Sequence, residues 1–289
     1  MENSQREILK LQLTQDLVLH YLSTDMCIGQ YICRAGSYEP FEMSLLLSLL
    51  NEGDIVVDIG ANIGVYTLNM AQKVGAMGKV YAFEPEPTNF ELLTKNVEEN
   101  ELTNVVCSDV ALSNRAAPAS LFISKQNFGD HRLYQEDNTE RKSVPVMTDT
   151  LDNLLREIYR EKGVVKVIKI DTQGFEPFVI EGAKQIIQEN HPAIFLEYWP
   201  AGFKNAGADY YAMMDFLVDV YGKLYLIDEY RKKIFSTNQD FIDGGCYASQ
   251  YFMERYFGAI DGAHCNIAFF GRDAILSFKK LANHVLRAK

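Results

Sequence analysis

A short run of acidic and small residues has the composition of a nucleotide-binding loop. Asp58, Gly60, Asn62 and Gly64 follow the apolar residues IVV and precede a segment with helical periodicity. Glycine lacks a β-carbon, so the backbone at such a strand-to-helix turn can approach a ligand closely. Asn62 stands where a middle glycine would be expected, and asparagine tolerates a positive φ. The spacing therefore predicts a ligand-binding turn, although two glycines can also make a tight turn without a ligand.

A second acid lies at the spacing expected for a ribose contact. Glu84 ends the next apolar run, twenty positions after Gly64, where a carboxylate can accept hydrogen bonds from two ribose hydroxyls. A dinucleotide dehydrogenase would require glycines at Asn62 and Val65, and neither position has one. Asp58 also suits a positively charged amino-acid group better than a pyrophosphate. This pattern favours S-adenosylmethionine over NAD as the cofactor.

Three further residues are candidates for the chemical step. Asp171 ends the run VVKVIKID, and Glu197 follows the run AIFL, so both are expected at the carboxyl edge of one sheet. Asp171 is the leading catalytic candidate, with helix capping near Glu176 as the alternative. Glu197 is a candidate for substrate binding or proton acceptance, or else forms a structural ion pair. His131 is a candidate base or a solvent-facing histidine.

Two of these acids are also candidate ligands for a metal ion. Mg²⁺ prefers oxygen ligands, and some O-methyltransferases require it, so Asp171 and Glu197 are its candidate ligands here. Spacing alone does not establish the geometry that a hard cation needs. We therefore favour a metal-free site.

The periodicity indicates alternating strands and helices around these residues. Strands are expected near 55–60, 79–85, 104–113, 164–171 and 193–198, with helices between them and a loop-rich stretch with an edge hairpin at 114–148. A helix near 209–222, two late strands that form an antiparallel edge, and a helix at 274–289 complete the pattern. We expect a doubly wound, mostly parallel α/β sheet in one domain, residues 41–289. Residues 1–40 are expected to form an N-terminal extension or lid containing a short hairpin.

The net charge, the cysteines and the lengths of the apolar runs indicate which binding partners and which compartment to expect. The 289-residue chain has a formal net charge of −11, which argues against nucleic acid as a partner. Its five cysteines include no C-x-x-C pair, as expected in a reducing compartment. The charged N-terminus and the absence of a long apolar run argue against secretion and membrane insertion. We expect a cytoplasmic protein and leave homo-oligomer formation open.

Over roughly residues 36–198 the sequence resembles the FkbM family of class I methyltransferases. The resemblance rests on SYEPFE, DIGANIGVYT, FEPEPTNFELLTKNV, DVALSN, FGDHRLY and IKIDTQGFEPFVIEGA. It implies a Rossmann-like sheet of seven strands. The chain departs from the family at Gln173, where an acid is usual. The implied cofactor-binding residues are Tyr38, Glu39, Asp58, Gly60, Ala61, Asn62, Gly64, Thr67, Glu84, Pro85, Asp109, Val110 and Ala111.

The resemblance also implies a function and a division of the cofactor site. Asp58 and the glycine turn would surround the methionine part, Glu84 the ribose, and Asp109–Ala111 the adenine. Tyr38 and Glu39 would lie near the cofactor, unless they form an ordinary surface turn. The implied reaction is O-methylation of a hydroxyl on a small-molecule or glycan acceptor, including a sugar or polyketide-like compound. N- or C-methylation and a non-catalytic cofactor-binding protein are the alternatives.

Overall fold

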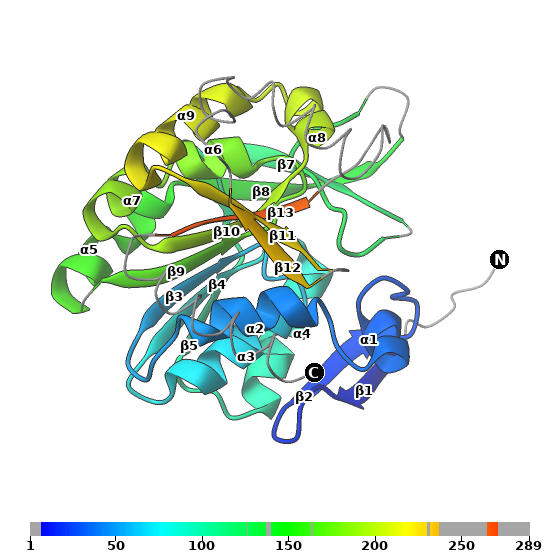
Figure 1. Ribbon diagram of the computed structural model, residues 1–289. Helices are drawn as coiled ribbons and strands as arrows, with labels where there is room; N and C mark the ends of the chain where they lie inside the picture. The colour runs from blue at the N-terminus through cyan, green and yellow to red at the C-terminus, as the bar shows by residue number, and fades with distance from the viewer. Residues whose placement is uncertain are drawn as a thin grey trace.

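A central sheet of eight strands forms the middle layer of the molecule (Figure 1). The computed structural model describes residues 7–125, 127–136, 140–162, 164–229, 232–236 and 265–270. The predicted helix at 274–289 lies outside this part of the chain. The strand order is β12-β11-β13-β10-β9-β3-β4-β5. These strands are β3 (Ile55–Ile59), β4 (Lys79–Phe83), β5 (Val105–Ser108), β9 (Val165–Ile170), β10 (Ala193–Tyr198), β11 (Leu224–Asp228), β12 (Lys233–Ser236) and β13 (Cys265–Phe269).

The predicted mostly parallel sheet with an antiparallel edge is confirmed. Strands β5, β4, β3, β9 and β10 are parallel neighbours, whereas β13 pairs antiparallel with both β10 and β11. Seven strands follow the expected arrangement, and β12 adds an eighth beyond β11. Every residue of β3 is buried because helices cover both faces of the sheet.

Successive residues of the strands supply two separate cores. Val56 packs with α2 (Pro40–Ser48), α3 (Val65–Val74) and α4 (Pro87–Glu99), whereas Val57 packs on the opposite face. Figure 1 shows the two helical layers on either side of the sheet, which confirms the doubly wound fold. The helices of the second layer are α5 (Leu151–Lys162), α6 (Glu176–Glu181), α7 (Lys184–Asn190), α8 (Pro200–Asn205) and α9 (Tyr210–Tyr221). No described helix has the length and apolar character needed to cross a bilayer.

Two predicted elements are divided in the structure. The strand expected at 104–113 ends at Ser108, and β6 (Ala111–Leu112) instead joins β8 (Lys142–Asp149) and β7 (Ala117–Ile123) in a separate three-stranded sheet. The expected hairpin is therefore not an edge of the main sheet. The helix expected after Glu176 is interrupted at Gly182, where an added β-carbon would lie 2.0 Å from the Ser113 carbonyl oxygen. This close approach to the segment after β6 explains why residue 182 is glycine.

The N-terminal segment contains the predicted hairpin, β1 (Ile8–Gln12) with β2 (Val18–Leu22), followed by α1 (Gly29–Ala35). Asn96 on α4 connects this segment to the main sheet. Its side-chain oxygen accepts from the His20 backbone N–H at 2.6 Å, and its Nδ2 donates to the carbonyls of His20 at 3.0 Å and Ile63 at 2.8 Å. A fully buried amide thus satisfies backbone groups of β2 and of the turn before α3.

The Asn96→Ala variant should be destabilised because it leaves buried backbone groups without hydrogen-bond partners. Each such group costs roughly 1–3 kcal/mol, so we expect the free energy of unfolding to fall by about 2–4 kcal/mol. Urea denaturation monitored by circular dichroism measures this change. Glu98→Ala, on the exposed side of the same helix, is the matched control and should leave the midpoint unchanged. Equal midpoints for the two variants would contradict the connecting role of Asn96.

Candidate functional site

A cavity of about 240 Å³ lies at the carboxyl ends of the parallel strands. Open α/β sheets bind ligands at this edge. Three of the predicted residues, Gly64, Thr67 and Asp109, do not line the cavity. The predicted residues that line it are Tyr38, Glu39, Asp58, Gly60, Ala61, Asn62, Glu84, Pro85, Val110, Ala111, His131, Asp171 and Glu197.

Gly60 lies at a close approach between the ends of two strands. Its φ is +75°, and an added β-carbon would lie 1.8 Å from the Asp171 carbonyl oxygen. The N–H groups of Gly60 and Ala61 donate to the Phe83 carbonyl at 2.9 and 3.0 Å. The missing side chain is therefore required by packing within the protein, before any ligand binds.

Asn62 and Glu84 connect the turn to the end of β4. Asn62 adopts the expected positive φ, +50°, and its N–H donates to Glu84 Oε2 at 2.8 Å. Glu84 Oε1 accepts from the Glu86 N–H at 2.9 Å. Burial raises the pKa of the Glu84 carboxyl to about 8. Glu84 thus organises the turn, and its contact with a ribose stays a prediction.

Asp58 offers an unsatisfied carboxylate oxygen to the cavity. Thr67 Oγ1 donates to Asp58 Oδ2 at 2.6 Å, so Thr67 positions the acid without itself lining the cavity. Oδ1 is buried and has no hydrogen-bond partner among the described residues. Burial raises the pKa of Asp58. A buried acceptor without a partner is costly, and a cationic donor in the cavity would satisfy it.

Lys169, which we did not single out from the sequence, provides the positive charge of the cavity lining. Its Nζ lies 3.6 Å from Asp171 Oδ2 and 4.6 Å from the centre of the Tyr66 ring. Burial alone would lower the pKa of Lys169, but Asp171, Asp58 and other nearby carboxylates outweigh that effect and raise it. The available signal was a lysine within the otherwise apolar end of strand VKVIKI.

The Tyr38-Glu39 pair belongs to the cavity rather than to an ordinary surface turn. The Tyr66 hydroxyl lies 3.0 Å from Glu39 Oε2 and 3.2 Å from Glu42 Oε1. Asn266 Nδ2 donates to Glu39 Oε1 at 3.4 Å. Burial raises the pKa of both acids, that of Glu42 to about 8. Glu42, Tyr66 and Asn266 are further site residues that the sequence analysis missed.

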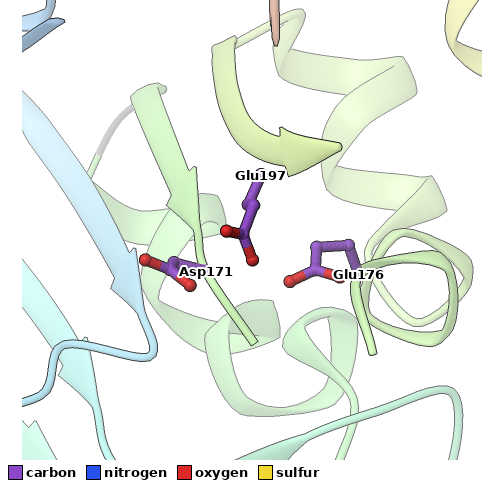
Figure 2. Close-up of side chains that lie close together, drawn as sticks. All are labelled: Asp171, Glu176 and Glu197. Atoms are coloured by element: carbon purple, nitrogen blue, oxygen red, sulfur yellow. The ribbon is translucent and has the colours of Figure 1, made fainter. Parts of the chain in front are cut away.

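Asp171 and Glu197 lie together as predicted, and Glu176 completes a cluster of carboxylates (Figure 2). Glu176 accepts from the Thr172 N–H at 2.6 Å and the Gly174 N–H at 3.0 Å, so it holds the turn after β9. Asp171 does not cap α6, whose N-cap position is Phe175. Burial, and secondly the charge of Asp171, raises the pKa of Glu197 well above its ordinary value.

Gln173 places an amide between the two candidate catalytic acids. Its Nε2 donates to Asp171 Oδ1 at 2.8 Å and to Glu197 Oε2 at 3.0 Å. The two acids therefore already share a donor that belongs to the protein. A divalent cation bound by the three carboxylates would require this amide to move or to present its oxygen in place of its nitrogen.

His131 lines the cavity and is not solvent-facing. The Ser124 N–H donates to its Nδ1 at 3.1 Å. Burial lowers the pKa of His131 to about 4, so the ring is neutral near pH 7. These features do not support the predicted general-base role.

The buried acids should make the ligand-free protein less stable as pH rises. The pKa of Glu42 is about 8 in the folded chain and 4.5 ordinarily, so between these values the folded state keeps a proton that the unfolded state has lost. The free energy of unfolding is then highest below about pH 4.5 and declines as the pH rises to about 8. The decline is at most about 1.4 kcal/mol per pH unit for each such group.

Glu42→Gln should therefore reduce the decline in unfolding free energy between pH 6.5 and 8, as measured by urea denaturation. Glutamine keeps the size of the side chain and its contact with Tyr66 while removing the titrating proton. Glu52→Gln, at an exposed position, is the control and should retain the slope of the unmodified chain. A variant at Glu42 with an unchanged slope would refute the assignment of a bound proton.

The chain is similar to curated methyltransferases over part of their length. It is 29% identical to Methyltransferase 1 of Beauveria bassiana over 45% of this chain and 59% of that protein. It is 30% identical to the hexuronic acid methyltransferase AglP of Haloferax volcanii over 50% of this chain and 56% of that protein. The matches thus span little more than half the length of these relatives.

A further relative and a solved structure are also named as methyltransferases. Methyltransferase sdnD of Sordaria araneosa is 27% identical, over 54% of this chain and 70% of that protein. The crystal structure of an FkbM methyltransferase from Methylobacillus flagellatus aligns with a TM-score of 0.43 and 14% identity, over 62% of this chain and 41% of that one. Residues 58–227 match the Methyltransferase FkbM domain. This match covers more than half of the chain, which therefore belongs to the FkbM methyltransferase family.

Proposed function

We propose that the protein transfers a methyl group from S-adenosylmethionine to a hydroxyl oxygen of a small-molecule or sugar acceptor. The observation that carries this proposal is the buried Asp58 Oδ1, which has no hydrogen-bond partner among the described residues and lies in a cavity whose lining includes five acids and one lysine. The cofactor has an ammonium and a sulfonium group, and both are attracted to such a cavity. A pyrophosphate would instead face Asp58, Glu39 and Asp171.

The residues present fit this cofactor by type and position. Asp58 would accept from the ammonium group, and the carboxylate of Glu84 faces the cavity at the next strand end, where ribose hydroxyls can reach it. Val110 and Ala111 line the cavity and would contact the adenine, whereas Asp109 does not line it. S-adenosylmethionine supplies an electrophilic methyl group when bound. The protein has to align the acceptor oxygen with that group and to remove the hydroxyl proton.

Asp171 is the better of the two acids for accepting that proton. Lys169 Nζ lies 3.6 Å from its Oδ2 and places a positive charge beside that oxygen. Burial raises the pKa of Glu197 well above its ordinary value and so disfavours its charged form, and we therefore assign it hydrogen-bond donation to the acceptor. Gln173 holds both acids in place. We assign no step to Mg²⁺.

A sugar acceptor is supported by one relative. AglP of Haloferax volcanii is named as a hexuronic acid methyltransferase and is 30% identical over half of this chain. The same site would also serve N- or C-methylation, so the product itself must identify the accepting atom. Mass spectrometry of products from a panel of sugars, alcohols, amines and carboxylates makes that distinction.

Isothermal titration calorimetry should show binding of S-adenosylmethionine and weak or no binding of NAD. Asp58→Asn should weaken cofactor binding roughly 10- to 100-fold, because a charge-assisted hydrogen bond is worth about 1.5–3 kcal/mol. Glu91→Gln, an exposed acid on α4, is the control and should bind as the unmodified chain does. Tighter binding of NAD than of S-adenosylmethionine would overturn the proposed function.

Asp171→Asn should lower kcat for methyl transfer about 10²-fold or more, because a positioned base typically contributes 10²- to 10⁴-fold. The dissociation constant of S-adenosylhomocysteine should change little, and asparagine retains an acceptor oxygen for the Gln173 amide. Initial rates with labelled S-adenosylmethionine and an acceptor found in the panel provide the measurement. Rates equal to those of the unmodified chain would remove Asp171 from the chemical step.

A further inference from the structure

One wall of the cavity combines apolar side chains with a single imidazole. Phe122 of β7 and Arg132 exchange two backbone hydrogen bonds, at 2.7 and 3.1 Å, in an antiparallel bridge. Because side chains alternate across such a backbone, His131 and Leu133 point away from the side on which Arg132 lies. Leu121, His131 and Leu133 all line the cavity. Arg132 instead stacks on Trp199, 4.7 Å from the ring centre.

The backbone fixes which ring nitrogen of His131 has the proton. Nδ1 accepts the Ser124 N–H at 3.1 Å and must therefore present its lone pair. In a neutral imidazole the other nitrogen is then the donor. The assignment follows from a backbone donor, which cannot reverse its role. His131 thus presents Nε2–H.

This donor is buried without a protein acceptor. Within the described part of the chain, Nε2 of His131 has no hydrogen-bond partner. Buried polar groups are nearly always paired, so an unpaired one that faces a cavity requires an acceptor there. The neighbouring cavity walls formed by Leu112, Leu121 and Leu133 are apolar, so a ligand atom is the suitable acceptor.

The same segment is attached to the cofactor turn. The Phe128 carbonyl accepts from Asn62 Nδ2 and from Asn89 Nδ2, each at 2.9 Å. Asn62 in turn contacts Glu84, the predicted ribose ligand. The acids Asp58 and Asp171 end β3 and β9, whereas the wall around His131 is built from the smaller sheet. The cavity therefore has an acidic part and a largely apolar part that contains the neutral His131 ring.

We propose that His131 Nε2–H donates a hydrogen bond to a ring nitrogen of the adenine base of the bound cofactor. This inference rests on the proposed function. An apolar wall with one neutral donor matches a flat, uncharged heterocycle whose ring nitrogens are acceptors. It does not match a sulfonium, an ammonium or a hydroxyl proton that must be removed. His131 is a binding and specificity residue rather than a base.

The test measures binding of S-adenosylhomocysteine by calorimetry, so that no acceptor substrate is needed. His131→Phe keeps a flat ring without nitrogen and should weaken binding about 3- to 10-fold, the value of one net hydrogen bond. His131→Gln, whose amide can donate from near the Nε2 position, should recover part of the loss. Thermal denaturation of the ligand-free variants establishes that each is folded.

The contact atom is identified with S-adenosylhomocysteine analogues in which C–H replaces one adenine ring nitrogen, at position 1, 3 or 7. One analogue should bind the unmodified chain 3- to 10-fold more weakly and show no further loss with His131→Phe, because both changes remove the same bond. Analogue losses that add fully to the loss from the variant would contradict the proposal, as would unchanged affinity in His131→Phe.

Two further outcomes separate this inference from the proposed function. If the unmodified chain does not bind S-adenosylhomocysteine, the proposed function fails and the inference fails with it. If the unmodified chain binds it and His131→Phe changes only the KM of the acceptor, the proposed function stands and the adenine contact is overturned.

Discussion

The contact between Gly60 and the Asp171 carbonyl brings together the two halves of the site. No β-carbon fits at Gly60, so β3 and β9 can end side by side with the Asp171 N–H donating to the Ile59 carbonyl at 2.9 Å. In the same parallel pairing Asp58 lies opposite Lys169. Residues more than one hundred positions apart therefore share one cavity. Any side chain at Gly60 would separate the strand ends on which Asp58, Lys169 and Asp171 depend.

The resulting site has more acids than one lysine can neutralise. Lys169 opposes the effect of burial on the pKa of Asp58, while burial raises the pKa values of Glu42, Glu84 and Glu197. A raised pKa disfavours the charged form of each of these acids. A cationic ligand would favour their ionised forms instead, so its binding and proton release are linked. The charge of the cavity thus suits a positively charged cofactor.

Local sequence patterns were sufficient for the parallel core and for the turn at Gly60–Gly64, because apolar runs and glycine spacing are short-range signals. They did not indicate that β6 would leave the main sheet, because that depends on pairing with β8, more than thirty residues later. The roles of Lys169, Glu42 and Asn266 likewise arise from contacts between distant elements. His131 was correctly placed near the site, but its role depends on the Ser124 N–H, which no pattern reveals.

Gln173 supplies a hydrogen-bond donor that Asp171 and Glu197 share. A carboxylate at this position would add a further acid to a partly buried pair and raise the cost of ionising all three. The Gln173 amide instead donates to both acids and adds no charge. Its positive φ of 54° turns the chain directly after β9, where Glu176 holds the turn through backbone N–H groups. Asp171 also lies beside Lys169, whereas burial raises the pKa of Glu197, so the two adjacent acids have different electrostatic surroundings.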